Sequence, residues 1–176
     1  MPDVLAHDLD LLLVGINPSL YSAHTGQHFA RPGNRFWPAL HQAGFTPHQL
    51  CPAEQNRLPE WGLGITNMVA RATARADELA PDELAAGGQR LVGLVGAYRP
   101  RCLGVLGVGA YRTAFAARRA VVGPQTERVG DAALWVLPNP SGLNAQWPLH
   151  RIVAELQRLR AWSKQGSGNR ESGQDV

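Results

Sequence analysis

The segment Leu11-Leu12-Leu13-Val14-Gly15-Ile16-Asn17-Pro18 joins an apolar run directly to an Asn-Pro turn, and Leu134-Trp135-Val136-Leu137-Pro138-Asn139-Pro140 repeats the arrangement. Each apolar run is typical of a buried strand, and each turn is then the loop at the carboxyl end of that strand. In an open parallel sheet such loops converge on one crevice, where ligands bind. Asn17 and Asn139 carry amides that both donate and accept, so the loops predict one site that holds a flat polar ring.

The rest of the chain alternates between strand and helix signals. The expected strands are 10–16, 64–69, 101–106 and 134–137; the expected helices are 35–43, 109–117 and those that begin at Pro81 and Pro148; and 19–33 is expected to be loop. This alternation predicts an α/β fold, a three-layer α/β/α sandwich around a mostly parallel sheet, with one domain over residues 1–163. Residues 164–176, rich in Gly, Ser and Gln, are expected to be a disordered tail.

Composition limits the classes of function. The 176 residues carry a net charge of +3, which permits a polyanionic partner such as DNA without requiring one. The two cysteines are too few for a Cys₄ iron–sulfur cluster, and the sequence shows no cluster of metal ligands, so neither a metal nor a cofactor is expected. No apolar run approaches the ~20 residues of a membrane span. Because Cys51 and Cys102 are too few for a disulfide framework, we expect a protein of the reducing cytoplasm.

Several short blocks occur in a fixed order along the chain. They are Gly15-Ile16-Asn17-Pro18, Ser22-Ala23, Gly26 to Phe29, Pro32, Asn34-Arg35-Phe36-Trp37, Ala86-Gly87-Gly88 and Asn139 to Leu143. With these blocks the chain resembles, from Asp10 to Leu159, the mismatch-specific uracil-DNA glycosylases of the thymine-DNA glycosylase family. The resemblance implies a three-layer sandwich that cleaves the N-glycosidic bond of a base flipped out of double-stranded DNA, in G·U-type mismatches. We expect it to act as a monomer.

The resemblance also implies roles for residues of the first loop. Asn17 matches the residue that holds the hydrolytic water, and an amide can position this water although it cannot take its proton at neutral pH. Phe29 matches the residue that stacks on the extruded base, and Ile16 and Ser22 are expected to contact the base as well. Stacking on an aromatic ring contributes about 1–3 kcal/mol per base.

The second loop is expected to enter the DNA. By resemblance, the loop residues Asn139, Ser141, Gly142, Leu143 and Asn144 contact the duplex from the minor groove. Leu143 is an apolar wedge of the kind that separates stacked bases, and Gly142 offers backbone groups to the partner base. The chain departs from the bacterial pattern after the wedge, where Ala145 and Gln146 replace a basic residue that often follows it.

Asp77 has two possible roles in the segment that follows the strand near Ile65. A carboxylate near the flipped sugar stabilises a developing cation and accepts a proton from water, which Asn17 cannot do. Alternatively, Asp77 pairs with Arg71 or Arg75, or caps the helix that begins at Pro81. The sequence leaves both roles open.

The arginines and the single lysine carry further expectations. Sixteen of the seventeen basic residues are arginine, and Arg31, Arg35, Arg71 and Arg75 are candidates for phosphate contacts. Lys164 has the only side-chain amine, and it lies in the expected tail, so a monofunctional enzyme without a Schiff-base intermediate is favoured. Two alternatives stay open: a protein that binds DNA lesions without cutting, and a dinucleotide-dependent oxidoreductase built on Gly107-Val108-Gly109.

Overall fold

A central five-stranded sheet organises the chain, and the computed structural model describes residues 1–167. The strands are β1 (Leu11–Gly15), β2 (Leu63–Asn67), β3 (Cys102–Leu106), β4 (Gly123–Pro124) and β5 (Ala133–Leu137), in the order β2-β1-β3-β5-β4. All pairs are parallel except β4 with β5. The runs of apolar residues are buried along nearly their whole length, as expected for strands covered on both faces.

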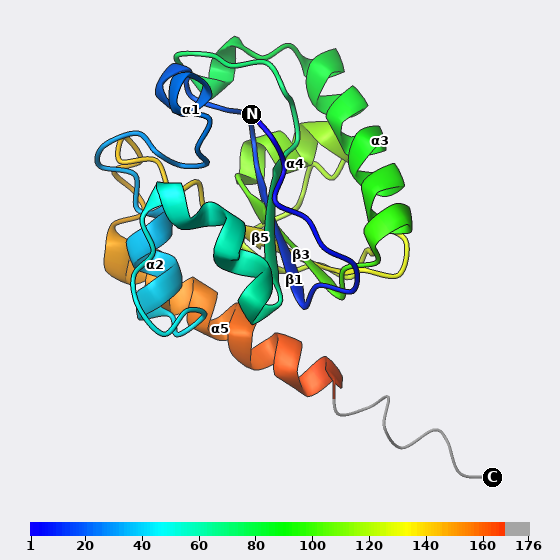
Figure 1. Ribbon diagram of the computed structural model, residues 1–176. Coiled ribbons are helices and arrows are strands. Elements are labelled where there is room, and N and C mark those ends of the chain that lie inside the picture. Colours follow the sequence, from blue (N-terminus) through cyan, green and yellow to red (C-terminus); the bar gives the residue numbers. More distant parts are fainter. Residues whose placement is uncertain (168–176) are drawn as a thin grey trace, which may run out of the picture.

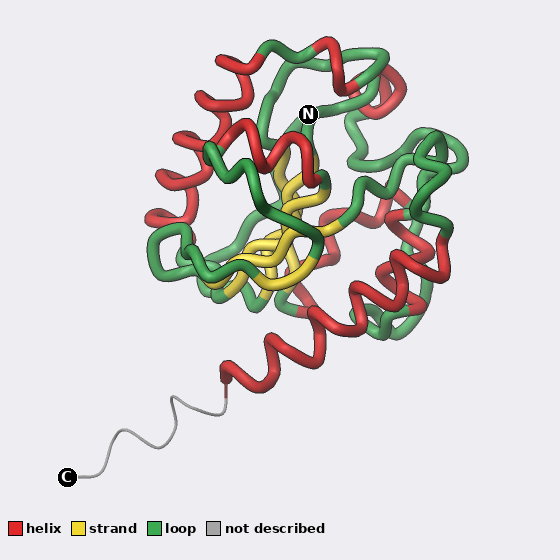
Figure 2. Tube along the Cα trace, turned by 180° about the vertical axis from the view of Figure 1, so that it is seen from behind, coloured by secondary structure: helices red, strands yellow, loops and turns green. Residues whose placement is uncertain are grey.

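Helices cover both faces of this sheet, which confirms the predicted three-layer α/β fold. Leu11 and Leu13 pack with α2 (Phe36–Gln42), the 3₁₀ helix η1 (Pro52–Trp61) and α5 (Leu149–Ser167). Leu12 and Val14 point the other way and pack with α3 (Pro81–Tyr98) and α4 (Val108–Ala114). Figure 1 shows α3 and α4 on one side of the strands and α2 and α5 on the other, and Figure 2 shows the same layers from behind.

Some local structure differs from the expectations. Residues 19–33 were expected to be loop, but they contain α1 (Leu20–Thr25), which begins where the Ser19 side chain accepts a hydrogen bond from Ser22 N. The short elements η2 (Ala76–Glu78) and β4 were also not predicted. Helix α5 continues to Ser167, beyond the boundary expected after residue 163, and residues 168–176 lie outside the described part. None of the helices in residues 1–167 is long and apolar enough to span a membrane.

The topology places a crevice at the carboxyl ends of β1 and β3. The chain leaves β1 toward α2, on one face of the sheet, and leaves β3 toward α4, on the opposite face. Because the two connections diverge, they leave a gap between the strand ends, the position where open α/β sheets bind ligands. This is the edge at which the two Asn-Pro loops were expected to meet.

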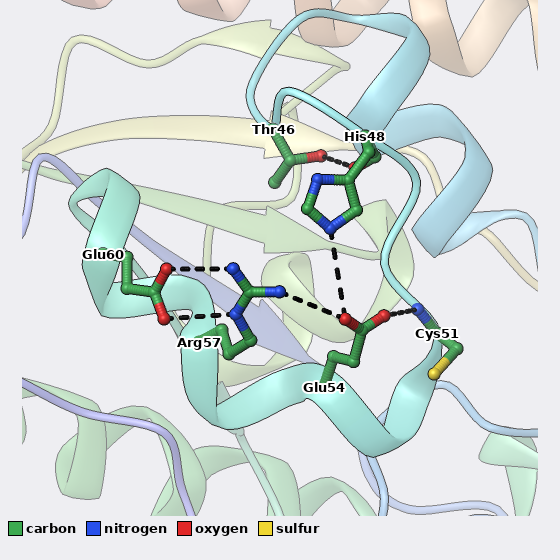
Figure 3. A network of polar contacts seen from close by, with 6 residues as sticks. All are labelled: Thr46, His48, Cys51, Glu54, Arg57 and Glu60. Atoms are coloured by element: carbon green, nitrogen blue, oxygen red, sulfur yellow. Dashed lines mark hydrogen bonds and ion pairs between the residues drawn. The ribbon is translucent and has the colours of Figure 1, made fainter.

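The 3₁₀ helix η1 is held by a polar network that Figure 3 shows in detail. Glu54 accepts a hydrogen bond from Cys51 N at 3.0 Å, and Arg57 donates to Glu54 and to Glu60 at 3.2 Å. The Nε2 atom of His48 lies 4.0 Å from Glu54. These contacts fix the helix from which Gln55 reaches into the loop before Phe29.

Candidate active site

A cleft of about 540 Å³ opens at the carboxyl edge of the sheet. Residues after three strands line it, namely Ile16 after β1, 107–110 after β3, and Pro138 and Asn139 after β5. Its other lining residues are Ala76, Asp77, Leu79, Leu84, Thr113, Asn144, Gln146 and Trp147. The structure therefore brings together four of the predicted site residues, Ile16, Asp77, Asn139 and Asn144, although they lie far apart in the sequence.

Asn17 is held in a fixed orientation beside this cleft. Its Nδ2 donates to the backbone carbonyl of Arg71 at 2.9 Å and to the hydroxyl of Thr73 at 2.7 Å. A carbonyl can only accept, so the nitrogen of the amide must face Arg71 and the oxygen must face away. No donor within the described residues reaches Oδ1 of Asn17. This oxygen is therefore free to accept a hydrogen bond from a water molecule or a ligand.

Phe29 forms one wall of a second, smaller corner next to Gly15. Its ring stacks on Phe36, with centroids 4.1 Å apart and planes inclined by 19°, and Phe36 is buried. A Cβ atom on Gly15 would lie 3.1 Å from Cζ of Phe29, so only glycine lets the end of β1 approach the ring this closely. Phe36 thus fixes the orientation of the Phe29 ring, and stacking of a base on this ring remains a prediction.

Asn67, at the end of β2, closes the same corner and was not predicted from the sequence. It is 8 % exposed, and its side-chain amide has no hydrogen-bond partner among the described residues. A Cβ atom on Gly15 would lie only 2.5 Å from its Oδ1. Among the described residues, Nδ1 of His28 is the only fully buried side-chain polar atom without a partner, so the Asn67 amide stays accessible to water or to a ligand. The signal was present in the sequence, because Asn67 follows an apolar strand as Asn17 and Asn139 do.

The backbone at Phe29 is strained and is held by its neighbours. Its φ of 53° is uncommon for a residue with a large side chain. Gln55 accepts from His28 N at 2.7 Å, Trp37 donates to His28 O at 3.0 Å, and Ser22 Oγ accepts from Ala30 N at 3.1 Å. Strain that is fixed in this way is characteristic of preorganised sites.

Two of these neighbours, Ser22 and His28, are buried polar residues. The Ser22 hydroxyl oxygen is buried and accepts hydrogen bonds from Ser19 Oγ and Ala30 N. It therefore holds the loop that carries Phe29, and its contact with a base remains a prediction. His28 is 1 % exposed, and burial lowers the pKa of its imidazole below the ordinary value of 6.5. Its Nε2 lies 2.9 Å from the carbonyl of Pro2, which ties the N-terminal segment to this loop.

Asp77 lines the cleft as a partly solvated carboxylate. Its side chain is 62 % exposed and forms an ion pair with Arg75 two residues earlier. One of the two alternatives, pairing with Arg75, is therefore present in the structure. The pairing does not remove the carboxylate from the cleft, because an exposed ion pair of this kind contributes little and exchanges readily with water. The catalytic role of Asp77 stays a prediction.

The second loop presents an exposed leucine on a rigid base. Leu143 is 70 % exposed, the largest exposure among the large apolar side chains of the described residues. Asn139 Oδ1 accepts from Ser141 N at 3.0 Å, and Asn144 Nδ2 donates to Asn139 O at 3.0 Å. Gly142 packs so closely on the first loop that a Cβ would lie 2.5 Å from the carbonyl of Gly33. A protruding apolar side chain on an internally bonded loop has the form expected of a wedge.

Three of the four arginines expected to contact phosphate are occupied. Arg71 pairs with Glu83 at 2.7 Å, which with other contacts lowers the pKa of that carboxyl to about 2, and Arg75 pairs with Asp77. The Arg35 side chain donates to carbonyls of the second loop. The guanidinium groups of these three arginines thus already bind acceptors within the protein. Arg31 is exposed and has no ion-pair partner in the described part of the chain.

A different arginine approaches the second loop from α5. The Arg151 guanidinium lies 4.5 Å from the ring centroid of Trp147 and donates to the carbonyl of Gln146 at 2.8 Å. It thus brings a positive charge next to the position where the loop itself lacks a basic residue. Within residues 1–167, no group of three or more His, Cys, Asp and Glu side chains is arranged to hold a metal ion.

The fold is a sheet covered on both faces, with a cleft at the carboxyl ends of its strands and with Gly15, Phe29 and Asn67 in contact at the end of β1. Comparison with known families gives this architecture a name. Residues 2–162 match the family model of the Uracil DNA glycosylase superfamily, and the chain belongs to this superfamily. Its membership supports DNA glycosylase activity.

A solved structure agrees with the fold. The chain is similar to the solution NMR structure of a candidate uracil DNA glycosylase from Methanosarcina acetivorans, with a TM-score of 0.65. The match covers 92 % of this chain and 95 % of that one, at 20 % sequence identity. At this identity the likeness shows that the fold is shared.

Proposed function

We propose that this protein is a monofunctional DNA glycosylase that hydrolyses the N-glycosidic bond of uracil, and of related damaged pyrimidines, in mismatched double-stranded DNA. One observation carries the proposal: the side-chain amide of Asn67, which has no hydrogen-bond partner among the described residues, and the ring of Phe29 meet at Gly15, at the end of β1. The corner thus combines a stacking surface with an amide that can both donate to and accept from the edge of a pyrimidine. We assign the chain to the mismatch-specific branch of the superfamily on the Gly15-Ile16-Asn17-Pro18 and Asn139-to-Leu143 blocks.

In the proposed reaction the nucleotide leaves the base stack and Leu143 fills the gap that it leaves. The base stacks on Phe29 while Asn67 binds its polar edge. Oδ1 of Asn17 accepts a hydrogen bond from a water molecule and directs its oxygen to the sugar carbon that carries the base. The glycosidic bond breaks, its electron pair leaves with the base, and the water oxygen forms the new bond to the sugar.

The proton of the water needs an acceptor other than Asn17, since a neutral amide has no useful basicity. We propose that Asp77 supplies it, because its carboxylate lines the same cleft as Ile16, the residue before Asn17. The carboxylate also stabilises the positive charge that develops on the sugar. The cleft gives room for the sugar and phosphate of the extruded nucleotide.

Preference for mismatches follows from the energy of extrusion. Flipping a base from a G·U pair costs less than flipping it from a well-stacked Watson–Crick pair, so part of the selectivity precedes any contact with Asn67. The strand should remain intact after base loss. A nicking enzyme needs an amine for a Schiff base, and the only lysine, Lys164, lies near the end of α5.

The non-catalytic alternative, a protein that only binds lesions, is favoured by the amide at position 17. One assay separates the two functions. Duplexes with G·U, A·U and G·T pairs and the corresponding single strands are incubated with wild-type protein and with Asn17→Ala, and released base and strand integrity are measured separately. We expect uracil release from G·U that Asn17→Ala largely abolishes, with strands that break only after alkali. Tight binding to G·U without base release would support the binder instead.

A further inference from the structure

Arg35 differs from the neighbouring arginines because no carboxylate in the described residues contacts it. Its guanidinium donates four hydrogen bonds, all to backbone carbonyls of the second loop. Nη1 reaches Ser141 O at 3.2 Å, Asn144 O at 2.9 Å and Trp147 O at 3.0 Å, and Nη2 reaches Gly142 O at 3.2 Å. The backbone N–H of Arg35 adds a bond to Pro140 O at 2.9 Å.

These bonds curve the second loop around one planar cation. The carbonyls of four loop residues turn inward to the guanidinium, so the side chain between them at position 143 points outward, where it is 70 % exposed. The contact between Gly142 and Gly33 fixes the loop from a second side, since even one methyl group does not fit there. The loop therefore has its shape before DNA arrives.

The residue after Arg35 contacts the base corner. Arg35 is the N-cap residue of α2, and the next residue, Phe36, stacks on Phe29 at 4.1 Å. Two consecutive residues thus contact the two elements that must act together, the stacking ring and the wedge. A displacement of α2 that moves Phe36 also moves the cation that shapes the wedge loop.

We infer that Arg35 is a positioning residue that couples the base corner to the wedge, so that insertion of Leu143 and seating of the base occur in one geometry. The inference rests on the proposed function for what the coupling does. Its structural part, that Arg35 holds the loop from Pro140 to Trp147, stands without it. Arg35 touches no reacting atom, and its effect passes through the loop.

Lysine is the informative substitution. It keeps the charge, but its ammonium ends one atom short of the guanidinium nitrogens and lacks the planar fork that reaches several carbonyls. Arg35→Lys should therefore loosen the loop while leaving the local charge in place. Arg35→Gln removes both and serves as the second variant. Arg101→Lys is the matched control, because Arg101 is paired with Asp10 and precedes β3, at the opposite edge of the sheet.

The first experiment needs no DNA. Amide hydrogen exchange is followed in wild-type protein, Arg35→Lys and Arg101→Lys. Asn144 N and Trp147 N donate within the loop, to Ser141 O and Asn144 O. We expect Arg35→Lys to speed exchange of these two amides about 10–100-fold while amides of β1 and β3 are unchanged. Unchanged loop exchange in both Arg35 variants, or equal acceleration throughout the sheet, would overturn the inference.

The second experiment measures coupling on DNA. Fluorescence of 2-aminopurine beside uracil reports base extrusion in Arg35→Lys, Leu143→Ala and the double variant. If Arg35 acts through the wedge, each single variant lowers base extrusion. Extrusion by the double variant is then within about threefold of that of the single variant with the lower extrusion. If the losses of extrusion free energy in the two single variants add up fully in the double variant, Arg35 and Leu143 act independently and the coupling is overturned. Extrusion by a wild-type protein that releases no base would contradict the proposed function while leaving this inference intact.

Discussion

Adding one methyl group at Gly15 tests the base corner directly. In Gly15→Ala the new Cβ lies 2.5 Å from Oδ1 of Asn67 and 3.1 Å from Cζ of Phe29. Ordinary van der Waals contact begins at 3.4 Å, so the Asn67 amide must move by about 0.9 Å, the difference between 2.5 and 3.4 Å. A misplacement near 1 Å costs on the order of 10²-fold in rate when a site depends on orientation.

We therefore expect Gly15→Ala to lower kcat/KM for uracil release about 10²-fold. Overpacking of this kind also lowers the free energy of unfolding by about 1–3 kcal/mol. For a chain of this length each kcal/mol lowers Tm by about 2–4 °C. Single-turnover release from a G·U duplex and a thermal melt measure the two effects separately.

Gly104→Ala provides a matched control in the middle of β3. Its Cβ would meet methyl groups of Leu13 and Leu137 at 3.1 Å, so it overpacks the core without touching the corner. It should lower Tm and leave kcat/KM within about threefold of wild type, since the protein stays folded at the assay temperature. If Gly15→Ala releases uracil as fast as Gly104→Ala, the positions of Phe29 and Asn67 do not determine how the base binds.

Three further predictions follow from individual side chains. Asp77→Asn should lower the single-turnover rate about 10²–10⁴-fold with little change in duplex binding; an unchanged rate would make Asp77 a partner of Arg75 only. Arg151→Gln should reduce the slope of log affinity against log salt by about 0.9, as for one phosphate contact, and an unchanged slope would exclude that contact. Burial lowers the pKa of His28, so as pH falls below 6.5 the unfolded chain binds a proton that the folded protein does not. The free energy of unfolding, measured in urea, should therefore fall with pH in this range, and it should fall less steeply in His28→Gln.

The sequence predicted the layers of the fold because each strand is a dense apolar run. Leu11 to Val14 is buried on both faces, and such a run leaves little choice except a central strand. Helix α1 was missed for a physical reason. It is six residues long, and its first two residues, Leu20 and Tyr21, are exposed, so it has no apolar face for a pattern to detect.

The site was predicted in part. Asn17 and Leu143 belong to sequence blocks whose order along the chain pointed to them. In the structure, Oδ1 of Asn17 has no donor among the described residues, and the Leu143 side chain is exposed. Arg35 was a candidate for a phosphate contact, which stays untested, and the structure adds acceptors that were not predicted, carbonyls more than a hundred positions later in the chain. Every residue has a backbone carbonyl, so the sequence does not indicate which carbonyls will accept from an arginine. Only the folded structure shows such a contact.

The most direct test of the account is a crystal structure with a duplex that carries an uncleavable uracil nucleotide opposite guanine. The account predicts an extruded uracil stacked on Phe29, with its polar edge hydrogen-bonded to the Asn67 amide. It further predicts a water molecule on Oδ1 of Asn17 that faces the sugar carbon, and Leu143 in the gap left in the stack. A uracil still paired in the duplex, or one bound among residues 107–110 and away from Asn67, would contradict it.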